Sequence, residues 1–179
     1  MNTAPFATLL WSMFSELVQG SPDPSERTYV LNQGDPGLLA SLDRLSAASA
    51  SATHDGPSIA AHVDHLRYGL SLLNRWANGT PPPWPDMDWT ASWRKNVVSD
   101  AEWQRLRDEL RREAAAWAEA LRSPREVSDV EAGWMVGCVA HLAYHMGAIR
   151  QIDRATHGPT AEDEANAQAN RGGSVEPTR

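Results

Sequence analysis

The stretch HLAYHMGAIRQI, residues 141–152, places two histidines four positions apart inside an apolar segment. Upstream residues continue the pattern at steps of three and four, which is typical of a helix that packs along one seam. The residues of this predicted seam are Trp134, Cys138, His141, His145, Ala148 and Ile152. Ser128 and Glu131 form a capping-box pattern at the start. We therefore expect a helix from Ser128 to about Thr156, with both histidines facing inward.

The two histidines suit a metal site, although the pair alone leaves a structural explanation open. Side chains four residues apart on a helix lie about 6 Å apart at Cβ, so both imidazoles can reach one divalent ion. Two inward imidazoles are costly to desolvate unless each nitrogen finds a partner. The segment is not the zincin motif, because HLAYH has no glutamate after its first histidine.

Three further segments show helical periodicity. Residues 4–18 and residues 58–79 repeat apolar side chains at three- and four-residue spacings. Residues 99–122 open with a Ser-x-x-Glu capping box. A shorter helical piece is expected within residues 34–51. The expected fold is all-α: a four-helix bundle with a short additional helix after the first long one.

Two other segments lack periodicity. NGTPPPWPDMDWTASW, residues 78–93, is rich in proline and tryptophan, so we expect a loop that packs down on the bundle as a lid or rim. Residues 158–179 contain almost no large apolar side chain and are expected to be disordered. The chain is therefore predicted to consist of a helical domain, residues 1–157, and a disordered tail, residues 158–179.

Composition and charge limit the functions that the chain can have. The net charge is −7 and no basic cluster exceeds two arginines, which argues against a nucleic-acid partner. No run of eighteen apolar residues exists, so we expect no membrane span. Residues 1–20 lack a basic start and contain Glu16, which favours an amphipathic helix over a signal peptide. Cys138 is the single cysteine, which excludes an internal disulfide and favours a reducing, cytoplasmic location.

The second long helix carries another pair of histidines, His62 and His65, three residues apart. At about 100° per residue, they lie about 60° and about 120° from the leucine stripe of that helix, within a widened apolar arc. A third imidazole beside His141 and His145 would complete a three-histidine site with an open position, the arrangement of catalytic zinc. The stripe geometry slightly favours His62 as this third ligand.

Over about residues 5–155, the chain resembles the DinB/YfiT-like superfamily of bacterial four-helix-bundle metalloproteins. The second helix contains the pattern S-I-x-x-x-x-x-H-L from Ser58, and the fourth contains H-x-x-x-H-x-G-x-I from His141. The start of the third helix, SDAEWQRLRDEL, is also similar to the family.

The resemblance implies that His65, His141 and His145 bind one divalent metal ion, such as zinc, nickel, iron or manganese. Its register selects His65 over His62, which then supports the site or the fold. The family often has a basic or polar residue directly after the second ligand of the fourth helix. This chain has Met146 there, so no polar neighbour is expected at that position.

The resemblance also implies a function. Some relatives are transferases or isomerases that use a low-molecular-weight thiol such as bacillithiol or mycothiol. We therefore expect a metal-dependent enzyme that acts on a small-molecule substrate, by thiol transfer or by hydrolysis. The alternative is a non-catalytic, stress-related homodimer in which the metal serves structure or binding. A fourth protein ligand such as Cys138 or His62 would favour the alternative, and an open pocket would favour catalysis.

Other polar residues are weaker candidates. Cys138 could be a ligand or a nucleophile, but a small core residue is the favoured interpretation. Tyr144 lies about 100° around the helix from the site. Asp64 and Asp153 could orient imidazoles, although solvated positions on a helix face are the favoured interpretation. The last candidates are arginines that could bind an anionic substrate and two histidines expected to be exposed: Arg67, Arg150, Arg154, His54 and His157.

Overall fold

The computed structural model describes residues 2–21, 27–53, 55–80, 87–160, 162–163 and 165–166. In these residues the chain forms six α-helices and no β-structure beyond an isolated bridge between Asn2 and Glu126, which confirms the all-α class. The helices are α1 (Ala4–Gln19), α2 (Gly37–Asp43), α3 (Ala47–Ala50), α4 (Ile59–Ala77), α5 (Asp100–Arg122) and α6 (Asp129–Ile152). No helix in this part of the chain combines the length and apolarity that a bilayer crossing requires.

Serine caps determine where the three longest helices begin. Ser58, Ser99 and Ser128 each adopt an extended backbone, and each side chain accepts a hydrogen bond from the N–H three residues later. These bonds satisfy backbone donors that have no partner within the helix. The capping boxes predicted at the starts of α5 and α6 are both formed.

Two helix boundaries differ from the predicted ones. The single additional helix expected within residues 34–51 is two short helices, because Ser46 adopts an extended backbone and caps α3 through the Ser49 N–H. The fourth long helix ends at Ile152 instead of continuing to Thr156. Its end is set by Asp153, which leaves the helical conformation and caps a following 3-10 turn.

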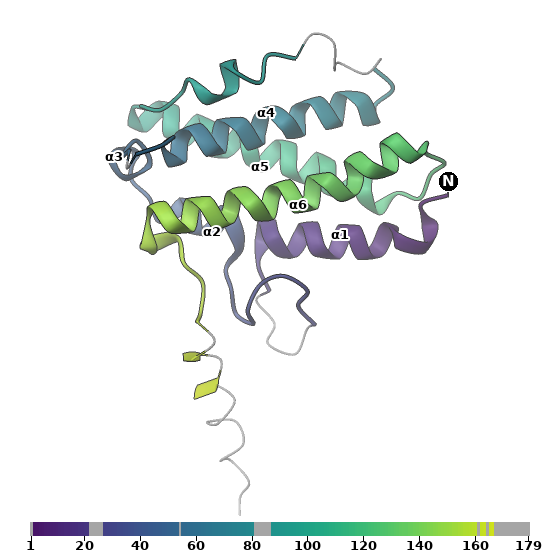
Figure 1. The fold of residues 1–179 in the computed structure, drawn as a ribbon, viewed down its shortest axis with the longest axis horizontal. Coiled ribbons are helices and arrows are strands. Elements are labelled where there is room, and N and C mark those ends of the chain that lie inside the picture. Colours follow the sequence, from purple (N-terminus) through teal and green to yellow (C-terminus); the bar gives the residue numbers. More distant parts are fainter. Residues whose placement is uncertain are drawn as a thin grey trace, which may run out of the picture.

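The connection between α4 and α5 returns along α4 instead of turning tightly (Figure 1). The Asp88 N–H donates to the Tyr68 hydroxyl at 3.2 Å, and the Ser58 N–H donates to Asn96 Oδ1 at 2.9 Å. α5 consequently begins at the same end as α4 and runs in the same direction, whereas α1 and α6 run the opposite way. The connection therefore lies across a face of α4, and this is the face that carries His65.

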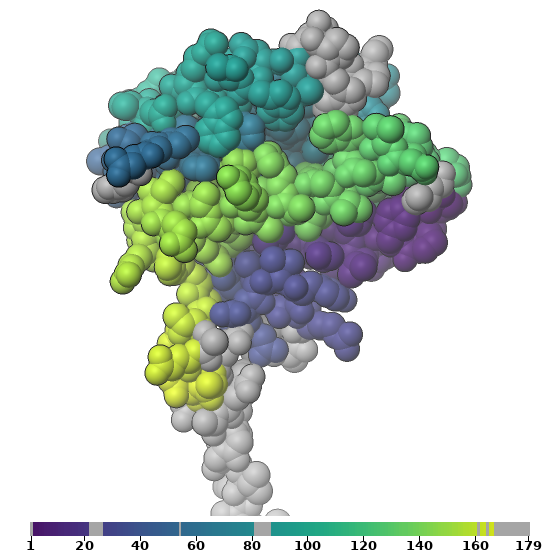
Figure 2. All heavy atoms as spheres, in the orientation of Figure 1, coloured from purple at the N-terminus to yellow at the C-terminus, as the bar shows by residue number. Residues whose placement is uncertain are grey.

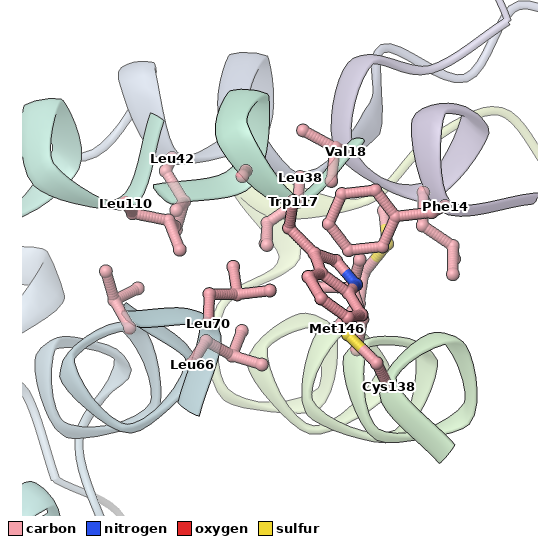
Figure 3. Packing of buried hydrophobic residues seen from close by; sticks show 14 of the residues in the cluster. Phe14, Val18, Leu38, Leu42, Leu66, Leu70, Leu110, Trp117, Cys138 and Met146 are labelled. Carbon is pink, nitrogen blue, oxygen red and sulfur yellow. The ribbon is translucent and has the colours of Figure 1, made fainter. Parts of the chain in front are cut away.

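The four long helices share one hydrophobic core (Figure 3). α5 packs against both α1 and α4, and α6 also packs against both of them. The fully buried Trp117 indole of α5 lies near the centre, beside Phe14 of α1 and close to Cys138 and Met146 of α6. Removal of these apolar side chains from water is the main force that holds the helices together.

α6 is rotated relative to the seam predicted from the sequence. Met135 is fully buried, whereas Trp134 of the predicted seam is 39% exposed. The core-facing stripe lies about 100° from the predicted one. Its residues are Ala132, Met135, Cys138, Val139, Leu142, Met146 and Ile149, and of the predicted seam Cys138 and His145 are buried. His141 and His145 consequently lie at the edge of the core, on the side of α6 that faces α4.

Part of the predicted tail, residues 158–179, is described. The Asn32 side-chain amide donates to the Pro159 carbonyl at 2.8 Å, and Thr160 and Asp163 exchange capping hydrogen bonds. Residues 161, 164 and 167–179 lie outside the described residues, so the disorder and the domain boundary stay predictions.

The rotation of α6 can be tested with two neighbouring residues. Met135→Ala removes a fully buried side chain and is expected to lower the free energy of unfolding by about 2–5 kcal/mol. Val136 is 55% exposed, so Val136→Ala is expected to change this free energy by less than about 0.5 kcal/mol. Urea denaturation followed by circular dichroism measures both values. Equal losses in the two variants would contradict the assigned core face.

Candidate metal centre

Four histidines meet where α4 and α6 run side by side in opposite directions (Figure 1). His62 and His65 lie on α4, and His141 and His145 lie on α6. The 3-10 turn η2 (Ala91–Trp93) packs on α4 beside them. Figure 2 shows the segment that contains η2, in teal, above α6, in green.

Three imidazole nitrogens converge in this region. His141 Nε2 lies 3.2 Å from His65 Nε2 and 2.9 Å from His145 Nε2. The ligand nitrogens of these three residues all lie within 4.8 Å of one another. α6 supplies two of them because its histidines are one helical turn apart, and α4 supplies the third. The structure thus brings together the three histidines that the resemblance implies as ligands.

The spacing of the nitrogens fits a single metal ion. Zinc–imidazole bonds of about 2.0–2.1 Å, at ligand angles between about 90° and 110°, place two ligand nitrogens about 2.9–3.4 Å apart. The measured separations of 2.9 and 3.2 Å lie within this range. Imidazole is a common ligand of zinc, iron and nickel. The donor set and these two separations therefore fit a divalent transition-metal ion.

Ser92 determines which nitrogen of His65 carries the lone pair. The Ser92 hydroxyl donates its single proton to the Trp89 carbonyl at 2.7 Å. Its oxygen lies 2.8 Å from His65 Nδ1, so it accepts the proton of that nitrogen. His65 Nε2 is then left with a lone pair on the side of His141. The Trp93 ring stacks on His65 with centroids 4.3 Å apart and restricts rotation of the imidazole.

His62 lies behind the three converging nitrogens and contacts His145. The two Nδ1 atoms are 2.9 Å apart, so one of them donates a hydrogen bond to the other. His62 also packs edge to face against Trp93, with centroids 5.2 Å apart. This is the supporting position that the resemblance implies for His62, and not the ligand position that the leucine stripe favours.

Burial lowers the pKa of all four imidazoles, because a charged ring loses its hydration inside the fold. For His65, burial and then His141 and His62 lower the pKa to about 4, against a smaller opposing effect of Asp64. For His145, burial and then its three histidine neighbours lower the pKa to about 3. The rings are therefore neutral at pH 7, which is the form that binds a metal ion.

A pocket of about 310 Å³ lies beside the histidines, between α4, α6 and Trp89. Its described lining carries two imidazoles, one thiol and two indole rings, and no charged side chain. The lining consists of His65, Leu66, Gly69, Leu70, Leu73, Trp89, Trp134, Gly137, Cys138, His141 and Leu142. Trp134 and Gly137 are exposed, so the pocket reaches the surface along α6.

Cys138 and Tyr144 do not have the surroundings of a nucleophile. Burial raises the pKa of the Cys138 thiol to about 12, so the thiol stays protonated at neutral pH. Among the described residues, the cluster of ligand atoms consists of the three histidines and does not include its sulfur. Tyr144 is 71% exposed, and its ring packs edge to face against His145 from outside.

The two aspartates considered as partners of the imidazoles have other roles. Asp64 is buried and pairs with Arg67 at 2.8 Å, so its interpretation as a solvated helix-face charge is wrong. Asp153 accepts the Ala155 N–H and caps the turn after α6.

The remaining candidates lie apart from the histidine cluster. Arg150 pairs with the buried Asp35 at 2.8 Å, and Arg154 begins the exposed turn after α6. His157 is exposed, as predicted, and its Nε2 donates to the Arg150 carbonyl at 2.7 Å. His54 and residues 81–86, which include Trp84 of the predicted loop, lie outside the described residues.

The sequence did not predict the role of Ser92 or the apolar pocket. Ser92 lies in the loop expected to pack on the bundle, but a loop serine carries no signal of a contact with a helix 27 positions earlier. The pocket forms between residues of α4 and α6 that have no proximity in the sequence.

Comparison of the chain with protein families, with curated proteins and with solved structures found no match. The likeness to the DinB/YfiT-like superfamily therefore stays a proposal.

The histidines make the stability of the metal-free protein depend on pH. An unfolded chain protonates its histidines near pH 6.5, whereas His65 and His145 in the fold stay neutral down to about pH 4 and about pH 3. Between these values the unfolded state binds more protons, so stability is greatest above pH 6.5 and falls as the pH decreases. The expected loss is about 1.4 kcal/mol per pH unit for each of the two histidines.

Denaturation of the chelator-treated protein between about pH 7.5 and about pH 5.5, above the range in which carboxylates titrate, measures this slope. The double variant His65→Gln/His145→Gln has neutral amides at both positions and is expected to show a flatter slope. Equal stability of the unaltered protein at the two ends of this range would contradict the assignment of neutral, buried histidines.

Proposed function

We propose that the chain is a metalloprotein of the DinB/YfiT-like four-helix-bundle type, in which His65, His141 and His145 hold one divalent transition-metal ion. The observation that carries this proposal is the convergence of three Nε2 atoms from two helices at separations of 2.9 and 3.2 Å. Two isolated core histidines would not require a third ring at the same point. The outer nitrogens of His65 and His145 have partners in Ser92 and His62, an arrangement typical of metal-binding histidines.

A site with three histidine ligands would leave one position of a bound ion open, which supports catalysis over a purely structural metal. A structural site is closed by four protein ligands, whereas a catalytic site keeps one position for water or substrate. In the described residues, the ligand cluster contains three histidines, and the pocket lies directly beside two of them. Cys138 and His62, the two residues that could have closed the site, occupy other positions.

The pocket lining favours thiol transfer over hydrolysis. When bound, a divalent ion with three neutral imidazole ligands supplies Lewis acidity and an open position for a sulfur or oxygen ligand. Hydrolysis also needs a group that takes a proton from water, and the described lining contains no carboxylate or amine for this role. A thiol is much more acidic than water, and a bound divalent ion would lower its pKa further, so it could lose its proton to solvent without a protein base. Ser92 and His62 hold the imidazole protons on the outer nitrogens, and the leucines exclude water.

The same lack of an acid or base favours a second candidate function, a metal-binding protein without turnover. In that case the pocket would hold a ligand and release it unchanged. The homodimer and the cytoplasmic location expected from the sequence stay predictions.

Metal content distinguishes the proposed ligands from the other histidines. Each of His65→Ala, His141→Ala and His145→Ala is expected to lower zinc affinity by more than the roughly 10–100-fold typical of losing an outer partner. The exposed His157 is the matched control, and His157→Ala should keep the affinity of the unaltered protein. Plasma mass spectrometry of untagged protein and zinc titration calorimetry measure these values. Unaltered metal content in all three variants would refute the site.

The same variants separate the two functions. Transfer of small thiols to an electrophilic reporter such as 1-chloro-2,4-dinitrobenzene should require both the metal and the three histidines. Turnover that persists in the His65→Ala variant would remove the thiol-transfer mechanism. Metal binding without turnover for any thiol would favour the non-catalytic function.

Ser92 provides a test of how the site is oriented. Ser92→Ala removes the acceptor that keeps the proton on His65 Nδ1, so we expect a loss of zinc affinity of about 10–100-fold. Ser71 is the control, because its hydroxyl donates to the Tyr68 carbonyl on the same helix. Competition against a chromophoric chelator measures both variants. An equal affinity for Ser92→Ala and Ser71→Ala would contradict the assigned role of Ser92.

A further inference from the structure

We propose that the pocket selects an elongated small molecule with an uncharged apolar body, aromatic or branched aliphatic, and a metal-binding group at one end. This inference rests on the proposed metal site and adds the class of molecule that the site receives. Three features of the pocket support the inference: its extension along α4 and α6, its uncharged lining, and the glycines at positions 69 and 137.

The pocket extends from the histidines along both helices. On α4 its lining runs from His65 to Leu73, and on the opposite-running α6 it runs from His141 back to Trp134. At about 1.5 Å of rise per residue, both paths measure about 10–12 Å. The two imidazoles therefore lie at one end of the pocket and Leu73 and Trp134 at the other, while Trp89 contacts His65 at the histidine end. A ligand that fills this space has a polar head and an apolar body.

The lining disfavours charge on that body. No Asp, Glu, Lys or Arg is among the described residues that line the pocket. The Cys138 thiol stays neutral because burial raises its pKa to about 12. An ionised group moved into such surroundings without a partner loses much of its hydration free energy. A body that carries carboxylates thus finds no charged partner in this lining.

Two glycines, one from each helix, keep this space open. A Cβ at Gly69 would lie 3.8 Å from the ring of Trp89, which also lines the pocket. A Cβ at Gly137 would meet nothing within 4 Å, so this position borders open space. Glycine within a helix costs about 1 kcal/mol relative to alanine. Because Gly137 lines the pocket, a longer side chain at this position would extend into the space of a bound molecule.

Zinc-binding probes that differ only in their bodies test the proposal. Acetohydroxamate, benzohydroxamate and 4-carboxybenzohydroxamate share one metal-binding head. Calorimetry with the zinc-loaded full chain should show benzohydroxamate binding at least about tenfold more tightly than acetohydroxamate, since its ring enters the apolar end. The carboxylated probe should bind no more tightly than acetohydroxamate. Equal affinities for all three probes would overturn the proposal.

A pair of glycine variants locates the effect in the pocket. Gly137→Leu places a side chain that leans toward Trp134, across the pocket, and should abolish the gain of benzohydroxamate while leaving zinc and acetohydroxamate binding unchanged. Gly133→Leu is the matched control, because Gly133 also borders open space on α6 but does not line the pocket. Both changes replace a helical glycine by a better helix former, so both variants should fold. If Gly137→Leu still bound benzohydroxamate as much more tightly than acetohydroxamate as the unaltered protein does, the proposal would be overturned.

A metal-free measurement separates the failure of this inference from the failure of the proposed function. Ethylbenzene added to the zinc-free protein should shift the amide NMR signals of Gly69 and Gly137, and the shift of Gly69 should be lost in Gly137→Leu. Shifts without any zinc binding would refute the metal site and support the apolar selectivity of the pocket. Zinc binding without these shifts, and without the benzohydroxamate gain, would refute the selectivity and leave the metal site standing.

Discussion

Three imidazole nitrogens that lie 2.9 and 3.2 Å apart impose a strict condition on the rest of the fold. Lone pairs at this distance repel one another unless a proton or a cation lies between them, and neighbouring charged rings repel even more strongly. The surrounding structure must therefore hold the rings neutral and in a defined tautomer. Burial lowers their pKa values, and Ser92 and His62 contact the outer nitrogens of His65 and His145.

This condition explains why the long return of the chain between α4 and α5 matters. A tight turn would leave the histidine face of α4 exposed to water. The returning segment instead covers this face, with Trp93 stacked on His65 and Trp89 forming one wall of the pocket. Hydrogen bonds from the backbone to Tyr68 and Asn96 hold the segment along α4. The same connection therefore orients His65, a proposed metal ligand, and forms part of the pocket beside it.

α6 combines two roles that require different faces of one helix. Its fully packed stripe, centred on Leu142, contacts the core around Trp117. Its edge carries His141 and His145 toward α4, and the next turns along this edge leave room at Gly137. Tight packing on one side gives the histidines a fixed position, and loose packing on the other leaves space for a ligand. This division supports a binding or catalytic role over a purely structural one.

The sequence by itself determined the elements whose forces act over three or four residues. Serine caps and apolar periodicity located the long helices, and the spacing of His141 and His145 put both rings on one side of α6. Only the tertiary structure decided that Met135 and not Trp134 faces the core, because apolar residues surround much of α6 and leave its rotation open. It also placed His65 among the converging nitrogens, His62 behind them and Ser92 on the outer nitrogen of His65. These contacts join segments far apart in the chain, so they depend on how whole helices pack and not on local backbone preferences.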